Sequence, residues 1–289
     1  MMDVVSAYWP HVLAAISIVT GAVAIAHAAM TKEDVRSAAG WVGVILLSPI
    51  LGAFVYLIAG VNRIRHTALA SRRSARHALW QEFYGPAVPH HAVAECFSKQ
   101  FLPMKQLGDT VTRFPLTAGN KIDILAAGDD AYRAIAKAIE DARHSIILET
   151  YIFDRDRIGL RIADLLIAAQ ARGVSVRVLI DSVGARYSVP SIVRYLRDRE
   201  VRTETFNGKV ITGLRLPYAN LRTHRKIIVV DNEIAFTGGM NIREAFSQEF
   251  HGQTFARDTH FRITGPIVAD LFFVAAEDWH FASGEKLAA

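Results

Sequence analysis

The stretch Leu221–Ile242, LRTHRKIIVVDNEIAFTGGMNI, decides how this chain folds. Its run IIVV consists of β-branched residues, so it predicts a strand over His224–Asp231. A second apolar segment, Ile234–Phe236, predicts another strand, and Gly238 and Gly239 follow it directly. Paired glycines let the backbone take positive φ or approach a ligand closely, so a binding site is predicted at the end of this strand.

His224 and Lys226 stand two residues apart on the first predicted strand and therefore project from one face. A neutral imidazole beside an ammonium suits a phosphate site, where Lys226 neutralises non-bridging oxygens and His224 attacks phosphorus or shuttles a proton. Taken alone, such a pair is more typical of a solvated strand edge, and the nearby glycines favour the site. Asp231, at the strand end, does not share the face of His224 and is interpreted as a structural carboxylate that accepts bonds from nearby backbone, although it is also counted with the catalytic residues. Asn241 is predicted to donate its amide to a phosphate oxygen.

The surroundings of this pair are basic. Between positions 205 and 230 the chain has five Lys or Arg residues and no Asp or Glu, which favours an anionic substrate. The whole chain of 289 residues has a net charge of +5, which equals the five arginines between positions 63 and 76. A globally basic nucleic-acid binder is therefore disfavoured. The single cysteine, Cys96, excludes an intramolecular disulfide, and no metal or cofactor is predicted.

Strand-like and helix-like segments alternate from Lys121 onward. The alternation predicts an α/β fold with a mostly parallel mixed sheet flanked by helices. Further strands are predicted at Lys121–Leu125, Ser145–Phe153, Val174–Asp181, Thr203–Phe206 and Asp258–Thr264. Helices are predicted at Asp129–Ala142, Ile158–Arg172 and Pro190–Asp198, and from Gly265 to about Trp279. The preceding segment, Thr67–Pro115, has little periodicity and is interpreted as a connector.

Two uncharged stretches, Val12–Ala29 and Ala38–Val61, lie near the amino terminus. Each has the length of a membrane-spanning helix, which needs about 20 mostly apolar residues. The short connector Met30–Ser37 makes them antiparallel neighbours, so a two-helix transmembrane hairpin is predicted. The alternative, two buried helices of a soluble core, is less favoured because neither stretch has a polar face. The arginine-rich run that follows predicts that the rest of the chain lies in the cytoplasm.

The residues His224, Lys226, Asp231, Gly238, Gly239 and Asn241 together have the spacing of the phospholipase D superfamily signature. Within that superfamily the chain resembles the bacterial cardiolipin synthases. The resemblance extends to LLSPILGAFVYLIAG in the apolar region, ILETYIF, RGVSVRVLIDSVG and RDTHFRITGP. One position departs from the pattern, because Thr223 stands where these enzymes often have Asn.

The resemblance implies a metal-independent transfer in two steps. His224 would attack a phosphatidylglycerol phosphodiester to form a phosphohistidine, and Lys226 would stabilise the developing charge. A second histidine would protonate the leaving alcohol and then activate a second phosphatidylglycerol, which yields cardiolipin and glycerol. Asp258 is the candidate partner that orients His224; the alternative is an ordinary carboxylate at a strand end.

This family uses two such motifs, one in each lobe, and the chain has one His-x-Lys. Three explanations stay open: a portion of a longer synthase, a homodimer that pairs two motifs across a two-fold axis, or an inactive remnant. The predicted domains are a membrane anchor (1–65), a connector (66–115) and a catalytic lobe (116–289). The expected location is the cell inner membrane, multi-pass, with the lobe on the cytoplasmic side. The alternative functions are a phosphodiesterase that uses water and a non-catalytic lipid-binding half-enzyme.

Overall fold

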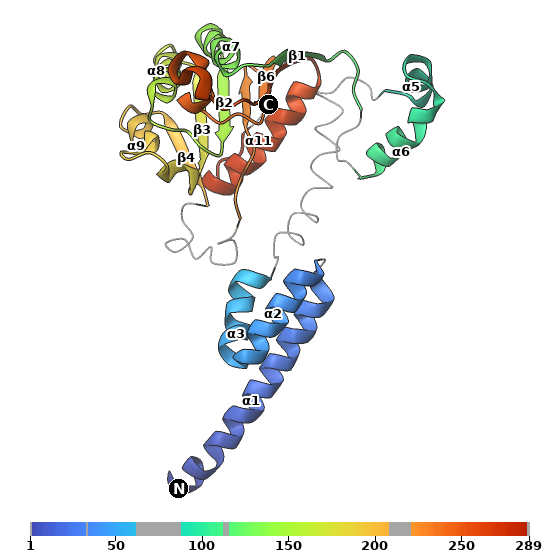
Figure 1. The fold of residues 1–289 in the computed structure, drawn as a ribbon, viewed down its shortest axis with the longest axis vertical. Helices are drawn as coiled ribbons and strands as arrows, with labels where there is room; N and C mark the ends of the chain where they lie inside the picture. The colour runs from blue at the N-terminus through green and yellow to red at the C-terminus, as the bar shows by residue number, and fades with distance from the viewer. Residues whose placement is uncertain (1, 33, 62–87, 112–115, 208–220, 288–289) are drawn as a thin grey trace. The chain divides into compact units, whose positions relative to one another are not determined.

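Figure 1 shows the computed structural model of the chain, which describes residues 2–32, 34–61, 88–111, 116–207 and 221–287. The elements fall into two compact units. The first unit holds the amino-terminal helices up to Gly60, and the second holds the elements between His90 and Ser283. The arginines between 63 and 76, from which the cytoplasmic side was predicted, lie outside the described residues.

The first unit begins with a long helix, α1 (Met2–Thr31). Its segment Tyr8–Thr31 has 24 residues and is apolar enough to cross a membrane. At about 1.5 Å per residue it extends about 36 Å, which exceeds a hydrocarbon core of about 30 Å. Within the described parts of the chain it is the one helix that meets both criteria. The first predicted spanning segment is therefore present with the expected length and composition.

The second apolar stretch, predicted as one spanning helix, is interrupted. It consists of α2 (Val35–Leu47), α3 (Pro49–Val55) and a π-helical turn, η1 (Tyr56–Gly60). The break lies at Ser48, whose φ of −149° and ψ of 85° are not helical. Pro49 follows and has no N–H with which to continue the helical hydrogen bonds of α2. The second spanning helix, in which Pro49 was expected to produce a kink, is therefore not confirmed, because the helix ends at this point.

α2 and α3 fold back against each other (Figure 1). A Cβ added at Gly52 would lie 2.6 Å from the carbonyl oxygen of Val44, so this close approach requires glycine. Lys32, just before α2, donates from Nζ to the carbonyl oxygen of Gly60 at the end of η1. The beginning and the end of the stretch therefore meet. The apolar helix Val35–Leu47 has 13 residues, fewer than the about 20 that a span needs.

The second unit is built on a seven-stranded sheet. The strands run in the order β1 (Lys121–Leu125), β7 (His260–Thr264), β6 (Ile234–Gly238), β5 (Ile227–Val230), β2 (Ser145–Thr150), β3 (Ser175–Asp181) and β4 (Arg202–Phe206). The pairs β2–β3 and β3–β4 are parallel. The other four pairs are antiparallel.

The sheet is mixed, as predicted, but the expectation that it is mostly parallel is wrong. Parallel neighbours need a crossover connection, usually a helix, whereas antiparallel neighbours need only a short turn. β5 and β6 are joined by the turn that contains Asp231 and Asn232, whose φ angles are 53° and 54°. Positive φ at both positions is typical of the tight hairpin turns that Asn and Asp favour. The turn residues explain why β5 and β6 are antiparallel.

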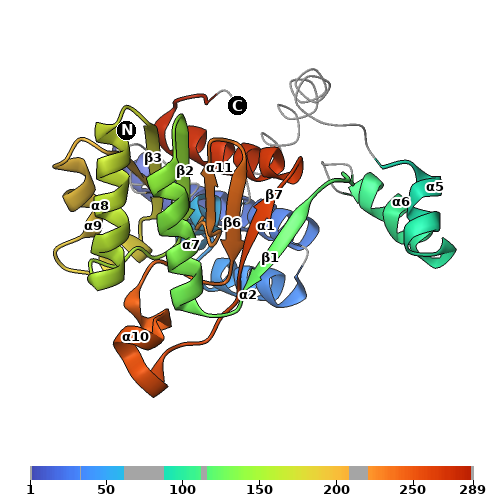
Figure 2. The same ribbon diagram turned by 90° about the horizontal axis from the view of Figure 1, so that it is seen from above.

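Helices cover both faces of the sheet (Figure 2). One face carries α7 (Gly128–Asp141) and α8 (Arg157–Ala171), and the other carries α11 (Ile267–Ser283). Ile146 and Leu148 of β2 belong to the main hydrophobic core, which includes α7 and α8. Because side chains alternate along a strand, Glu149 projects to the opposite face, where α11 packs. β2 therefore contributes to the core on one side and carries a carboxylate on the other.

The segment predicted as a connector contains helices in its described part. These are α5 (His90–Cys96), the 3-10 turn η2 (Lys99–Phe101) and α6 (Leu102–Val111). The shorter elements of the catalytic region are η3 (Gly184–Arg186), α9 (Ile192–Arg197), η5 (Glu244–Phe246), α10 (Gln248–His251) and η6 (Gly252–Thr254). The described part of the predicted connector is therefore helical rather than irregular, and its role as a connector stays a prediction.

Candidate active site

His224 and Lys226 lie in an extended segment that leads into β5, which begins at Ile227 rather than at His224 as predicted. The Lys226 side chain is buried and donates from Nζ to the carbonyl oxygen of His224 at 2.8 Å. His224 itself is exposed. Both side chains contact Tyr151, whose ring lies 5.0 Å from the His224 ring and 5.7 Å from Lys226 Nζ. The structure therefore places the predicted pair on one side of the segment.

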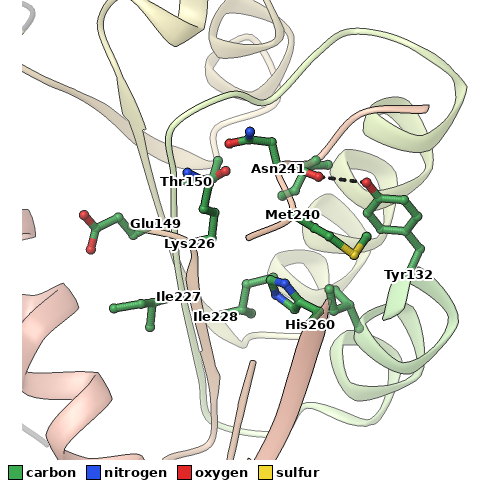
Figure 3. Close-up of a pocket in the computed structure, with 11 residues that line it drawn as sticks. Tyr132, Glu149, Thr150, Lys226, Ile227, Ile228, Met240, Asn241 and His260 are labelled. Atoms are coloured by element: carbon green, nitrogen blue, oxygen red, sulfur yellow. Dashed lines mark hydrogen bonds between the residues drawn. The ribbon is translucent and has the colours of Figure 1, made fainter. Parts of the chain in front are cut away.

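A small cavity of about 10 Å³ lies beside Lys226 (Figure 3). Its polar lining includes Thr150, Lys226, Asn241 and His260. Burial lowers the pKa of Lys226, and the negative charge of Asp258 partly offsets this effect. The ammonium is therefore removed from bulk water and held where a phosphate oxygen would meet a less screened positive charge.

Asp258 packs against the glycine pair. A Cβ at Gly239 would lie 2.3 Å from both carboxylate oxygens of Asp258, so a larger residue there would have to displace this carboxylate. The carboxylate also accepts from the N–H of Thr259 at 2.7 Å. Its charge acts on Lys226 and His260. Between the described residues Asp258 and His224 there is no direct hydrogen bond, so the predicted orienting contact stays a prediction.

His260 is a site residue that the sequence reasoning missed. It is 3% exposed and lies opposite Gly238 in the β6–β7 pairing. Burial lowers its pKa to about 4, with an opposite effect from Asp258 and a further lowering effect from Lys226. Within the described residues its Nδ1 has no hydrogen-bond partner. Its position two residues after Asp258 places both groups near the glycine pair, a signal that the sequence offered.

Asn241 and the glycines shape the other side of the site. Gly238 has φ +152°, and a Cβ there would lie 2.4 Å from the carbonyl oxygen of Thr259. Asn241 accepts from the N–H of Ile152 through Oδ1 at 3.1 Å, so its amide NH₂ is the group it offers to a ligand. Tyr132 donates to the Asn241 carbonyl oxygen at 2.7 Å and fixes the backbone. The role of Asn241 as an amide donor to phosphate stays a prediction.

Asp231 lies away from the catalytic pair. It follows the carboxyl end of β5, whereas Lys226 precedes the other end, and five residue steps in an extended chain cover about 16 Å. Its carboxylate accepts from the N–H groups of Arg143, His144 and Ser145 at 2.8 Å each. Burial raises its pKa, but these backbone bonds outweigh burial and the net pKa is lowered. These contacts agree with the predicted structural carboxylate that accepts backbone hydrogen bonds, and a catalytic role for Asp231 stays an untested prediction.

A buried polar network supports the His224 segment from the α11 side of the sheet. Thr223 donates its hydroxyl to Glu149 and its backbone N–H to Asp181, the latter at 3.1 Å. Glu149 is 1% exposed and Asp181 is fully buried. Burial raises the pKa of Glu149 to about 7, although the Thr223 bond and the charge of Arg225 act in the opposite direction. Figure 3 shows the Glu149 side chain pointing away from the other polar groups of the cavity.

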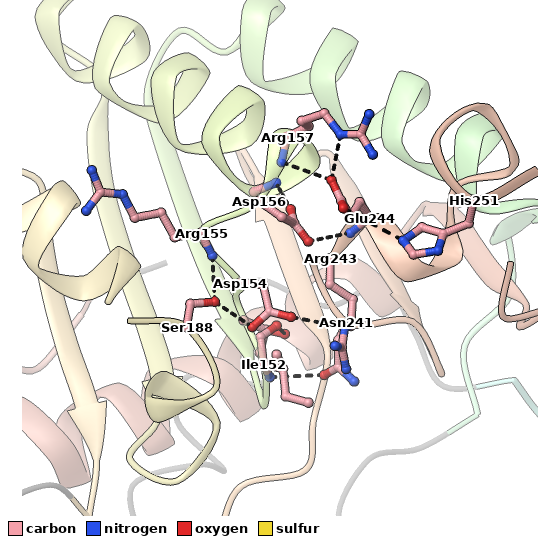
Figure 4. A network of polar contacts seen from close by, with 12 residues as sticks. Ile152, Asp154, Arg155, Asp156, Arg157, Ser188, Asn241, Arg243, Glu244 and His251 are labelled. Atoms are coloured by element: carbon pink, nitrogen blue, oxygen red, sulfur yellow. Dashed lines mark hydrogen bonds and ion pairs between the residues drawn. The ribbon is translucent and has the colours of Figure 1, made fainter. Parts of the chain in front are cut away.

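Polar contacts also fix the loops around this edge of the sheet (Figure 4). Asp154 pairs with Arg243 at 3.0 Å and accepts from the Ser188 hydroxyl at 2.8 Å. Nearby, Glu244 accepts from Arg157 Nε at 2.8 Å, and the Glu244 N–H donates to Asp156 at 2.6 Å. The loops that follow β2, β3 and β6 are therefore tied to one another.

The arrangement offers an exposed imidazole, a desolvated ammonium, an amide donor and a buried neutral imidazole. These groups suit attack on an anionic phosphodiester with stabilisation of its oxygens. Among the described residues, no group of three or more His, Cys, Asp or Glu side chains could hold a metal ion.

The comparisons with known proteins agree with this chemistry. The family described as "Cardiolipin synthase, PLD-like domain" matches residues 135–251, and the family "Phospholipase_D-nuclease N-terminal" matches residues 12–60. Cardiolipin synthase A of Pseudomonas fluorescens is 30% identical over 96% of this chain and 59% of the relative. Cardiolipin synthase of Alkalihalophilus pseudofirmus is 30% identical over 86% of this chain and 49% of the relative.

Among solved structures, a phospholipase D family member from Salmonella typhimurium matches with a TM-score of 0.45 and 21% identity, over 58% of this chain and 99% of that chain. The chain spans between 49% and 59% of the length of the two curated relatives described above. The family match covers the segment that contains His224, Lys226 and Asn241. The chain therefore belongs to the phospholipase D superfamily, and its relatives there are cardiolipin synthases.

Proposed function

We propose that this chain is a membrane-bound phosphatidyltransferase that converts two phosphatidylglycerols to cardiolipin and glycerol. The observation that carries the proposal is the pairing of exposed His224 with buried Lys226 on one side of the same segment. The family resemblance supplies the substrate, because the relatives that match most of this chain are named cardiolipin synthases. The reaction transfers a phosphatidyl group in two steps. A P–O bond is exchanged for a P–N bond in the first step, and the P–N bond for a P–O bond in the second.

In the first step, His224 attacks the phosphorus of phosphatidylglycerol. A P–N bond forms, the P–O bond to the glycerol headgroup breaks, and the leaving alkoxide takes a proton and departs as glycerol. In the second step, the hydroxyl of another phosphatidylglycerol loses a proton and attacks the phosphohistidine, which releases His224 and forms cardiolipin. Lys226 stabilises the charge on the non-bridging oxygens in both steps.

The remaining site residues have supporting roles in this proposal. The Asn241 amide donates to a phosphate oxygen, since its Oδ1 is engaged by the backbone of Ile152. Gly238 and Gly239 allow the close approach of β7 and of Asp258, whose charge balances Lys226. A direct contact that orients the His224 ring through Asp258 would need a shift of one of the two side chains.

The proton transfers need a second histidine, and we propose that it comes from a second catalytic lobe or from a second copy of this chain. Buried His260 is a poor candidate for that role, because its pKa of about 4 keeps it neutral and its side chain is almost completely buried. In a homodimer, a two-fold axis would bring two copies of His224 together.

We further propose that the first unit anchors the enzyme in the inner membrane. The helix Tyr8–Thr31 has the length and composition of a span. In place of the second spanning helix of a transmembrane hairpin, α2 and α3 would enter the bilayer as two short helices that meet at Ser48. The arginines between 63 and 76 favour a cytoplasmic location for the catalytic unit.

The second candidate function is a phosphodiesterase that uses water as the acceptor. The same half-site favours it, since a phosphohistidine without a bound alcohol acceptor is open to hydrolysis. A lipid-binding half-enzyme without activity is the third possibility, and the single motif favours it. Product analysis distinguishes the three.

The proposal is tested with membranes that contain the full chain and labelled phosphatidylglycerol. Wild-type membranes should form cardiolipin and release glycerol, and His224→Ala should abolish both. His144→Ala is the matched control, because His144 is also exposed but contacts Asp231 through its backbone at the other end of β5. Phosphatidic acid as the product would support hydrolysis instead. Absence of any product, alone or with a second lobe supplied, would contradict both enzymatic proposals.

A further inference from the structure

The loop that follows β3 lies at the same edge of the sheet as the catalytic pair. β2 and β3 are parallel, and β5 runs antiparallel to β2 with Glu149 opposite Ile227. The carboxyl ends of β2 and β3 therefore meet the beginning of β5. The loop of residues 182–191 thus emerges next to the segment that carries His224 and Lys226. The β5–β6 turn with Glu233 lies at the opposite edge.

This loop is held rigidly. A Cβ at Gly184 would lie 1.7 Å from the carbonyl oxygen of Tyr151, so the loop packs directly on the end of β2. Ser188 donates to Asp154 at 2.8 Å and accepts from the N–H of Arg155 at 2.9 Å (Figure 4). Ser191 closes the loop by donating to the carbonyl oxygen of Ala185 at 2.9 Å.

The tip of this fixed loop is apolar, basic and exposed. Val189 is 94% exposed and Tyr187 is 57% exposed, whereas Gly184 and Ala185 beneath them are buried. Arg186 and Pro190 are exposed as well. Burial of an apolar side chain that a fixed loop holds in water lowers the free energy. Because the loop is already ordered, little conformational entropy is lost on binding.

The tip is physically connected to the catalytic pair. Burial raises the pKa of the Tyr151 hydroxyl, and Tyr187 lies close enough to raise it further. The Tyr151 ring contacts both His224 and Lys226. A surface that holds Tyr187 would therefore fix the distance between itself and the nucleophile. Tyr is a side chain with an apolar body and a polar tip, which suits the headgroup level of a bilayer.

We propose that the tip formed by Arg186, Tyr187, Val189 and Pro190 docks into the headgroup region of an anionic phospholipid bilayer and brings His224 to the level of the lipid phosphodiester. This inference rests on the proposed function, because a substrate that stays in the bilayer must meet the nucleophile at that level. The exposed arginines 155 and 186 complement anionic headgroups, and the carboxylates Asp154 and Asp181 at this edge are buried.

A lipid surface fits this tip better than a protein partner. Two apolar side chains flanked by arginines form a small patch, whereas a stable protein interface buries about 800 Å² on each partner around a largely apolar centre. Amphipathic side chains and cations are the combination that inserts into the boundary between headgroups and acyl chains. A second lobe or a second copy of the chain is the alternative occupant, and the experiment separates it.

The test places a fluorescent dye on the tip of the full chain in nanodiscs that contain phosphatidylglycerol. In a Cys96→Ser background, which removes the single cysteine, Val189→Cys is labelled with an environment-sensitive dye. Glu233→Cys is the matched control, since Glu233 is exposed at the opposite edge of the same sheet. Lipids with nitroxides near the headgroup and deeper in the acyl chain report the depth of the dye.

The dye at position 189 should show blue-shifted emission, and the shallow nitroxide should quench it. This result would place the dye about 5–10 Å into the boundary between headgroups and acyl chains. The dye at position 233 should show neither effect. Replacing phosphatidylglycerol with a zwitterionic lipid should weaken the quenching at 189. A dye at 189 that lipid nitroxides do not quench would overturn the proposal, and protection from aqueous iodide in that case would assign the tip to a protein interface.

The readout does not depend on turnover. The His224→Ala chain, which should be inactive, is expected to give the same quenching at position 189. If the wild-type chain has no transferase activity, the proposed function is contradicted, whereas the docking result does not change. Quenching that is equal at positions 189 and 233 would show that the whole unit lies on the membrane without a preferred edge, which would also overturn the inference.

Discussion

Thr223 donates its hydroxyl proton to Glu149, a carboxyl group that is 1% exposed and lies on the opposite side of the sheet from the main core. Its second oxygen, Oε2, has no hydrogen-bond partner within the described residues. Thr223 immediately precedes His224, so the protonation state of Glu149 is coupled to the segment that carries the nucleophile. The strand pairing of Glu149 with Ile227 makes this support a fixed part of the sheet.

The raised pKa of Glu149 predicts a loss of stability as pH rises. Its pKa is about 7 in the fold and 4.5 ordinarily, so the folded state retains a proton that the unfolded state releases between these values. Relative to Glu149→Gln, the wild-type free energy of unfolding should fall by about 3 kcal/mol from pH 4.5 to pH 7. Thermal unfolding of both proteins in one detergent, followed by circular dichroism, measures this. Parallel pH curves would contradict the prediction.

The lowered pKa of His260 predicts the opposite dependence. Its pKa is about 4 in the fold and 6.5 ordinarily, so the unfolded state binds a proton first as pH falls through this window. His260→Gln should therefore remove an acid destabilisation of about 3 kcal/mol. The windows of His260 and Glu149 overlap, so their slopes largely cancel in the wild type. Each single variant should expose the slope of the other group, and the double variant should be flat again.

Gly239 should be sensitive to an added side chain, because that side chain would displace the Asp258 carboxylate. A methyl group there would meet the carboxylate of Asp258 at 2.3 Å, so Gly239→Ala should displace Asp258 and destabilise the fold by about 1–3 kcal/mol. Gly108→Ala is the control, because a Cβ at Gly108 meets no atom within 4 Å and lies in α6, where alanine is favoured. Unfolding transitions of the two variants should shift in opposite directions. Equal shifts would show that the contact with Asp258 is dispensable.

Asp231 should contribute to stability and leave the chemistry unchanged. Asp231→Ala leaves three backbone N–H groups without their acceptor, at a cost of about 2–4 kcal/mol. At a temperature where the variant is folded, its rate of lipid transfer should match the wild type, whereas Lys226→Met should lose about 10²–10³-fold at unchanged stability. A variant of Asp231 that is stable but inactive would reassign this residue to catalysis.

One short segment carries most of the candidate site, so the sequence could group its residues without knowledge of the fold. His224, Lys226, Gly238 and Asn241 lie within 18 consecutive residues, so local spacing alone brought them together. Glu149 and Asp181 come from strands far away in the chain, and only the β2–β3–β5 register shows that both reach Thr223. Their side chains gave no local signal, since a carboxylate at a strand end is usually exposed.

The errors in the fold have similar causes. Asp231 and Asn232 specify a tight hairpin, and that signal was overlooked in favour of an alternation typical of parallel sheets. The stretch before Val61 is long enough to span a membrane, and Pro49 predicted a kink within one helix, whereas the structure ends one helix at Ser48 and begins another at Pro49. The helices within residues 90–111 were not predicted because the prolines at 86, 89, 103 and 115 suggested irregular structure, although Pro103 lies in the first turn of α6.

The contact between Lys32 and Gly60 bears on which side of the bilayer the chain begins. An apolar segment that enters and leaves the bilayer through the same surface adds no crossing. α1 would then be the single crossing between the amino terminus and the catalytic unit. The amino terminus would then face the periplasm while the catalytic unit faces the cytoplasm, whereas two full spans would return both to the same compartment. A cysteine introduced near Met1 should therefore react with a membrane-impermeant reagent in intact cells. Labelling that occurs only after lysis would support the two-span topology instead.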